Sequence, residues 1–134
     1  MTYLIDTDRV VDYLSGRETP PGLLSTLRPD GIAISIVSYS EIYEGIYGSR
    51  DPKAAEQAFR DFLQGTAVLG VTRSVAKQNE RIRSHLRGQR HPIASRALDL
   101  LIAATALAYD LSLVTHNQDD YGDIPGLKLY QPCY

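Results

Sequence analysis

Two patterns of hydrophobic and polar positions alternate along the chain. Short apolar runs at residues 3–5, 32–37, 67–71 and 111–115 predict four strands, with a weaker candidate at 127–130. The segments between them have helical spacing and suitable start and stop residues, which predicts helices at 7–14, 23–27, 38–47, 53–63, 73–88 and 97–110. We expect Pro20 and Pro21 to open the second helix, and residues 116–123 to form a loop.

This alternation of strands and helices defines the expected fold class. Continuous apolar strands separated by helices are typical of a parallel sheet that is covered on both faces. We therefore predict an α/β protein, built as a three-layer α/β/α sandwich around a central, mostly parallel sheet. Because no Pro-rich or Gly-rich linker divides the chain, we expect a single domain over residues 1–134.

Composition narrows the function classes only slightly. The chain is 43% hydrophobic and 22% charged, with a formal net charge of −2. That balance lacks the basic excess of a typical nucleic-acid binder, although a local patch or a metal ion can serve instead. Cys133 is the single cysteine, so no intrachain disulfide can form, which favours a reducing compartment. The first residues lack signal-peptide features, and no apolar stretch approaches the ~20 residues of a membrane span, so we expect cytoplasmic localisation and no membrane contact.

Acidic residues follow the predicted strands. Asp6 comes directly after the first strand, Glu41 follows the second, and Asp119 and Asp120 follow the fourth. In parallel α/β sheets, ligands bind beyond the carboxyl ends of the strands. Asp99 stands near the start of a nearly apolar helix, where an uncompensated carboxylate costs several kcal/mol to bury.

Each of these acids has a structural alternative. Asp6 is suited to cap the first helix, and Ser38 with Glu41 matches a capping box at the start of the third. Asp99 could form an ion pair with Arg96 or Arg83. The two acids after the fourth strand lie in a sequence that is typical of solvated turns.

Taken together, the acids favour a metal site. Like charges gathered at one edge cannot all stay ionised cheaply, and a divalent cation removes that cost. Oxygen ligands favour Mg²⁺ or Mn²⁺, and two such ions ~3.5–4 Å apart form a phosphodiester-cleaving site. The three histidines, His85, His91 and His116, lack a zinc-binding spacing.

Three stretches carry a resemblance to a known family. "YLIDTDRVVDYL", "ISIVSYSEIYEGI" and "LDLLIAATALAYDLSLVTHNQDDY", followed by "IPGL", resemble a PIN domain, most closely the VapC-type toxins of toxin–antitoxin pairs. The resemblance covers essentially the whole chain and implies a PIN-like fold. It places the family's first acid at Asp6, its glutamate at Glu41 and its helix-borne acid at Asp99. Its T-x-N-x-x-acid-aromatic segment maps to Thr115, Asn117, Asp120 and Tyr121.

The resemblance implies a Mg²⁺-dependent endoribonuclease, with Mn²⁺ as a substitute, that forms a homodimer and is silenced by a cognate antitoxin. Asp6 and Asp99 would bind the principal metal, and Glu41 would complete the site and orient or deprotonate the attacking water. Asp120 would hold a second ion; Asn117 and Asp119 are alternatives for this fourth position. Thr115 and Asn117 would hydrogen-bond the scissile phosphate or a ligating carboxylate.

Two other functions fit parts of the sequence. The stretch from Asp6 to Arg9 resembles the start of haloacid-dehalogenase-like phosphatases, with Asp6 as nucleophile and Asp8 as acid, but this leaves Asp99 without a role. A PIN-like binding module without catalysis is the second, although its three central carboxylates are present.

Two surfaces are candidates for partner contacts. Tyr39, Tyr43 and Tyr47 recur every four residues, which indicates either core packing or, with Ile46, a groove for an antitoxin helix or a dimer mate. Basic residues on and after the helix at 73–88 form either a solvated face or RNA phosphate contacts: Lys77, Arg81, Arg83, Arg87 and Arg90.

Overall fold

Four short parallel strands form the centre of the part of the chain that the structure describes, residues 1–18 and 22–131 of a computed structural model. In spatial order they are β3 (Thr66–Leu69), β2 (Ile32–Ser35), β1 (Tyr3–Ile5) and β4 (Ser112–Val114). Every pairing is parallel, with Leu4 opposite Ala33 on one side and Leu113 on the other. Pro20, Pro21 and Cys133, which entered the sequence predictions, lie outside the described residues.

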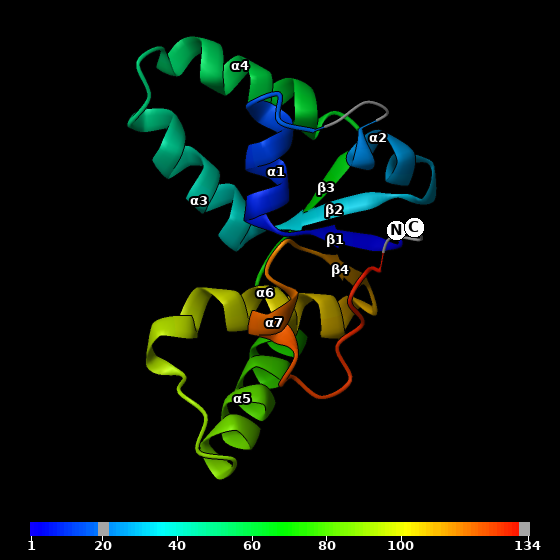
Figure 1. Cartoon of the computed structure of the whole chain (residues 1–134), viewed down its shortest axis with the longest axis vertical. Helices are drawn as coiled ribbons and strands as arrows, with labels where there is room; N and C mark the ends of the chain where they lie inside the picture. Colours follow the sequence, from blue (N-terminus) through cyan, green and yellow to red (C-terminus); the bar gives the residue numbers. More distant parts are fainter. Residues whose placement is uncertain (19–21, 132–134) are drawn as a thin grey trace.

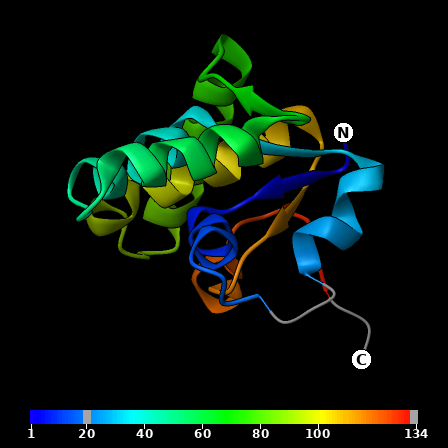
Figure 2. The ribbon, with the colours of Figure 1, turned by 90° about the horizontal axis from the view of Figure 1, so that it is seen from above.

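Helices cover both faces of this sheet (Figure 1). In chain order they are α1 (Thr7–Leu14), α2 (Leu23–Leu27), α3 (Ile36–Tyr47), α4 (Pro52–Leu63), α5 (Arg73–Gly88), α6 (Ala97–Tyr109) and α7 (Gln118–Tyr121), with single 3-10 turns at Arg28–Asp30 and Ala94–Arg96. Helices α1, α3 and α4 lie on one face, and α5, α6 and α7 lie on the other. Figure 2 shows the same separation from above. The predicted three-layer α/β/α class is confirmed.

The core is divided by the sheet because successive strand residues point to opposite faces. Ile5 and Ile34 join the core beneath α1, α3 and α4, whereas Leu4 and Ala33 join the core around α5 and α6. All four are fully buried. Their burial explains why the polar residues of β2, β3 and β4 stand only at strand ends, at Ser35, Thr66 and Ser112, as expected for a parallel sheet.

The junction between β2 and α3 differs from the sequence prediction. The strand ends at Ser35 rather than Val37, and the Ser35 hydroxyl caps the helix by accepting from the Ser38 amide at 3.1 Å. The predicted cap at Ser38 is therefore wrong, and so is the capping box with Glu41. The apolar residues 36 and 37 are helical because a serine precedes them that can satisfy the first free amides.

Two further predictions need correction. The candidate strand at 127–130 makes only an isolated bridge, Leu113 to Leu129. The expected loop after β4 contains the one-turn helix α7. No helix in the described ranges is long and apolar enough to cross a membrane.

Candidate active site

Asp6 lies at the carboxyl end of β1, where the chain turns into α1. Its side chain is only 5% exposed. Oδ1 accepts from the Thr7 amide at 2.8 Å, so Asp6 does cap the helix, and Oδ2 accepts from the hydroxyls of Thr115 (2.8 Å) and Tyr121 (3.2 Å). Burial, aided by the negative charges of Asp8 and Asp99, raises the pKa of Asp6 from 3.8 to about 6, despite the opposing hydrogen bonds.

Asp8 is a second carboxylate beside Asp6. Its Oδ2 accepts from the His116 amide at 3.1 Å and lies 3.3 Å from the Thr115 hydroxyl. Its Oδ1 is buried and has no hydrogen-bond partner among the described residues. A buried anionic oxygen without a donor is costly. This oxygen is therefore suited to accept from a ligand.

Glu41 reaches the same region through Thr7. The Thr7 hydroxyl contacts Glu41 Oε1 at 2.7 Å and Ser38 Oγ at 2.9 Å, which links α3 to the start of α1. Since the Thr7 amide also holds Asp6, one residue orients both carboxylates. Ser38, the third residue of α3, is fully buried at this junction.

Asp99 completes the acidic group from the first turn of α6. It is half-buried, and its pKa is raised by burial and by the negative charge of Asp120, while the nearby Tyr121 hydroxyl and the charge of Arg96 oppose this. Its charge also raises the pKa of Asp6, so the two acids interact electrostatically. Burial and the charges of Asp6 and Asp99 raise the pKa of the Tyr121 hydroxyl, which therefore remains a donor.

The alternative ion pairs predicted for Asp99 do not form. Arg96 makes a bidentate pair with Asp123, at 2.9 Å (Nη1 to Oδ2) and 2.8 Å (Nη2 to Oδ1). Arg83 lies 3.7 Å from Glu80 on its own helix. Within residues 1–18 and 22–131, Asp99 has no ion-pair partner.

The remaining candidate site residues lie in the segment after β4, on the wall of a pocket beside the acidic group. Asn117 and Asp120 are exposed and line a pocket of about 600 Å³, together with Asp119. The Asn117 amide donates to Thr115 Oγ1 at 3.0 Å. The structure therefore brings five site residues together at the carboxyl ends of the strands: Asp6, Asp8, Glu41, Asp99 and Thr115. Asn117, Asp119 and Asp120 lie on the wall of the adjoining pocket.

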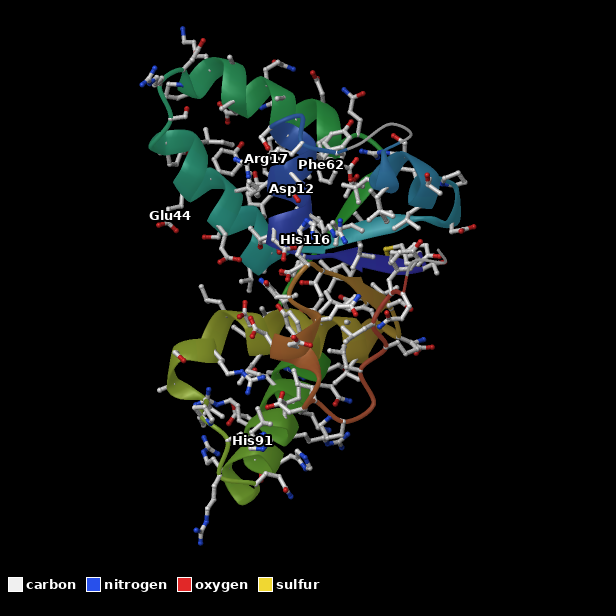
Figure 3. The ribbon with its side chains drawn as sticks, viewed as in Figure 1. Asp12, Arg17, Glu44, Phe62, His91 and His116 are labelled. Carbon is white, nitrogen blue, oxygen red and sulfur yellow. The ribbon has the colours of Figure 1, made fainter. Side chains whose placement is uncertain are left out.

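The histidines stand apart from this acidic group or at its border. His116 pairs with Asp12 of α1, and these two side chains lie side by side in Figure 3. His91 pairs with Asp123 at 2.9 Å, toward the other end of the molecule, and His85 is exposed on α5. In the described ranges, no three His, Cys, Asp or Glu side chains are placed so that they could hold a metal ion.

Two residues of this site, Asp8 and Thr7, were not predicted as metal-site residues from the sequence. Asp8 entered only through the phosphatase alternative, and Thr7 was not among the predicted site residues. The signal was present, because both directly follow Asp6 at the carboxyl end of a strand. The Tyr121 contact with Asp6 spans 115 positions, so no local pattern reveals it.

The two surfaces predicted for partner contacts are each only partly exposed. Tyr39 and Tyr43 pack against Phe59 of α4, with ring centroids 5.5 and 5.7 Å away, whereas Tyr47 is 75% exposed. The basic residues are exposed except for Arg83, which is partly buried.

Comparison with known proteins identifies the family. The PIN domain model matches residues 3–127, so this chain belongs to the PIN domain family. It is 32% identical to Ribonuclease VapC19 of Mycobacterium tuberculosis (strain ATCC 25618 / H37Rv) over 98% of both chains, and 26% identical to Ribonuclease VapC1 of Haemophilus influenzae (strain R2866) over 96% of both. The VapBC2 structure from Rickettsia felis, bound to a promoter DNA fragment, superposes with a TM-score of 0.88 at 24% identity, covering 99% of this chain and 100% of that one, which supports the fold. These findings agree with the resemblance seen in the sequence.

Proposed function

We propose that this chain is an endoribonuclease of the VapC type, the toxin of a toxin–antitoxin pair. The observation that carries the proposal is the buried Asp6 carboxylate, which lies among Asp8 and Asp99 without a paired cation in the described residues. The ribonuclease relatives support the substrate class. The phosphatase alternative loses its basis, because the chain belongs to a different family.

Mg²⁺, or Mn²⁺ in its place, is the cofactor that we propose for this site. The donors fit in chemistry, since they are carboxylate oxygens, and Oδ1 of the neighbouring Asp8 has no hydrogen-bond partner among the described residues. No three of the described acids converge on one point, so binding would require these side chains to move closer together. Asp6, Asp99 and Glu41 would hold the principal ion, and Asp120 a second. Such an ion lowers the pKa of bound water and stabilises negative charge on the phosphate in the transition state.

The protein side of the mechanism follows from the hydrogen bonds. Thr7 and Thr115 fix the two oxygens of Asp6, so that this carboxylate keeps one orientation. Thr115 therefore serves a carboxylate rather than the scissile phosphate. Thr7 also positions Glu41, which we propose accepts the proton of the attacking water. We also propose that Asn117, which lines the adjoining pocket, hydrogen-bonds the phosphate.

The direct test is cleavage of a labelled single-stranded RNA by the purified chain. We expect cleavage with Mg²⁺, none with EDTA, and background activity for Asp99→Asn, because a neutral amide binds Mg²⁺ poorly. Mn²⁺ should raise the melting temperature of the wild type more than that of Asp99→Asn. Metal binding without RNA cleavage would instead indicate an inactive PIN-like binding module.

We further propose that the antitoxin binds an apolar groove between α1, α3 and α4. The groove has a volume of about 240 Å³ and includes Val11, Ile42 and Ile46, and an added Cβ at Gly45 meets no atom within 4 Å. Gly45→Gln should fill the groove and weaken antitoxin binding, while Gly45→Ala should retain it. Unchanged binding of Gly45→Gln would exclude this surface. Homodimer formation stays a prediction, which sedimentation of the purified chain can test.

A further inference from the structure

A pocket adjoins the acidic group on its solvent side. It has a volume of about 600 Å³, within the usual range for small-ligand sites, and is lined by Arg9, Gln131 and the segment 115–120 that follows β4. Thr115 belongs to both places, because it lines the pocket and donates to Asp6. A molecule in this pocket therefore lies next to the proposed reaction centre.

Arg9 is the unexplained residue of the pocket. It is the only lysine or arginine among the lining residues, and it comes from α1, one turn after Asp6. Its side chain is half-buried, and its Nε is shielded from solvent without a hydrogen-bond partner among the described residues. Its guanidinium also forms no ion pair within residues 1–18 and 22–131. A partly desolvated guanidinium with free donors is suited to a phosphate, which it binds through paired hydrogen bonds.

The same pocket is also lined by side chains of a kind that can hydrogen-bond a base. Gln118 Nε2 donates to the Tyr130 carbonyl at 2.9 Å, and Gln118 Oε1 accepts from Gln131 Nε2 at 2.9 Å. This chain of bonds holds the Gln131 amide in place, with its own oxygen and one N–H still available. Preordered side chains lose less entropy when they bind. Asp119 is exposed beside them and adds acceptor oxygens.

We propose that this pocket binds one nucleotide of a single-stranded RNA, with a phosphate at Arg9 and the base against the Gln131 and Asp119 side, an inference that rests on the proposed ribonuclease function. The arrangement separates the charges, because the phosphate lies at the cation and the base lies at the acid. Carboxylate acceptors favour bases with an exocyclic amino group, such as the N4 amine of cytosine. The pocket thus selects cytosine over uracil, which presents a carbonyl at that position.

The phosphate contact can be tested by binding alone. Fluorescence anisotropy would measure the binding of two labelled RNA octamers, one of eight cytidines (C8) and one of eight uridines (U8). EDTA would be present, so that hydrolysis is suppressed. Arg9→Gln should weaken both RNAs to the same degree, by about tenfold, because a phosphate contact carries no sequence information. The slope of log affinity against log salt should fall by about 0.7. Arg60→Gln on α4 makes the same charge change at an exposed site and should bind like the wild type. Equal behaviour of these two variants would overturn the proposal.

The base contact is tested by the preference between the two RNAs. The wild type should bind C8 about fivefold more tightly than U8, which corresponds to one hydrogen bond. Asp119→Asn should reduce that ratio, since an amide oxygen is a weaker acceptor than a carboxylate. A wild-type ratio near one, or an unchanged ratio in Asp119→Asn, would overturn the assignment of the base.

Folding and function are separated by two further measurements. Arg9→Lys keeps the charge but loses the planar pair of donors, so it should bind more weakly than the wild type with an unchanged melting temperature. If the wild type cleaves C8 with Mg²⁺ and the Arg9 variants bind normally, this inference alone fails. If the wild type does not cleave but Arg9→Gln still loses affinity, the ribonuclease function fails and the nucleotide pocket stands.

Discussion

Carboxylates lie in two places close to the start of α6: Asp123 forms one group by itself, and Asp6 with Asp99 forms the other. The electrostatic surroundings of these two groups are opposite. Asp123 receives a bidentate pair from Arg96 and a contact from His91, and hydrogen bonding by Arg96 holds its pKa below the usual value. Asp6 receives only neutral donors, Asp99 has no ion-pair partner among the described residues, and both have raised pKa values. Both burial and partners make the difference: burial is the main cause of the raised pKa of Asp6 and Asp99, whereas the hydrogen bonds from Arg96 are the main cause of the lowered pKa of Asp123.

The pairing of Asp123 with Arg96 stabilises the fold, whereas we propose that Asp6 and Asp99 are held for a metal ion. A paired carboxylate contributes to stability, whereas gathered carboxylates without a cation destabilise the folded state. A protein retains the second arrangement where function requires it.

Catalysis should separate the two groups most strongly. Asp6→Asn should lower RNA cleavage by about a thousandfold or more, because it removes a charged metal ligand. Asp123→Asn makes the same chemical change outside the site and should retain near wild-type cleavage. Initial rates with a labelled RNA, measured on folded variants, give the comparison. Similar losses of cleavage rate in both variants would contradict the distinction between the two groups.

The pH dependence of stability should have opposite signs in the two groups. Since the pKa of Asp6 is raised to about 6, the folded state binds a proton that the unfolded state releases between about pH 4 and 6. The free energy of unfolding should therefore fall by about 2–3 kcal/mol from this residue as pH rises through that window in EDTA. Asp6→Asn should remove the fall. The lowered pKa of Asp123 acts the other way: its contribution is present above about pH 4 and is lost on further acidification.

Urea unfolding at several pH values, with EDTA present, measures both effects. Asp6→Asn is a suitable probe, because asparagine caps a helix about as well as aspartate does. A wild-type stability that rises between pH 4 and 6, with no change in Asp6→Asn, would contradict the raised pKa.

Stability at neutral pH should distinguish the groups by a smaller amount. Arg96→Gln should cost about 2 kcal/mol, because it removes charge-assisted hydrogen bonds from a largely buried pair. Asp99→Asn should unfold at or above the wild-type temperature in EDTA, since it relieves repulsion. Thermal unfolding of both variants tests this. A strongly destabilised Asp99→Asn that still cleaves RNA would make Asp99 a structural residue.

The smallest effect concerns His91. Its Nδ1 lies 2.9 Å from Asp123, but the imidazole is 43% exposed. Exposed pairs contribute roughly 0–1 kcal/mol, so His91→Gln should lower the free energy of unfolding by about 0.5 kcal/mol. Urea unfolding of His91→Gln and Arg96→Gln, measured together, would show whether Arg96 is the dominant partner of Asp123. A larger loss of unfolding free energy in His91→Gln would reverse that order.

Much of the fold could be predicted from the sequence because its signals are local. The helix at 73–88 has the predicted bounds, and the four strands lie where short apolar runs occur. The junction at Ser35 could not be placed, because Ser35 and Ser38 are both suitable caps. The choice depends on which hydroxyl lies free at the end of the strand and which is taken by Thr7.

For the candidate site, the sequence by itself determined the family and the acids at the ends of the strands, since residue type and spacing carry that information. Only the tertiary structure decided the partners. Asp6 contacts Thr115 and Tyr121 across more than a hundred positions, and Arg96 pairs with Asp123 rather than with Asp99, three residues away. The physical reason is that hydrogen bonds and ion pairs depend on distance and direction in space. These become defined only when β1, β4 and the start of α6 meet at one edge of the sheet.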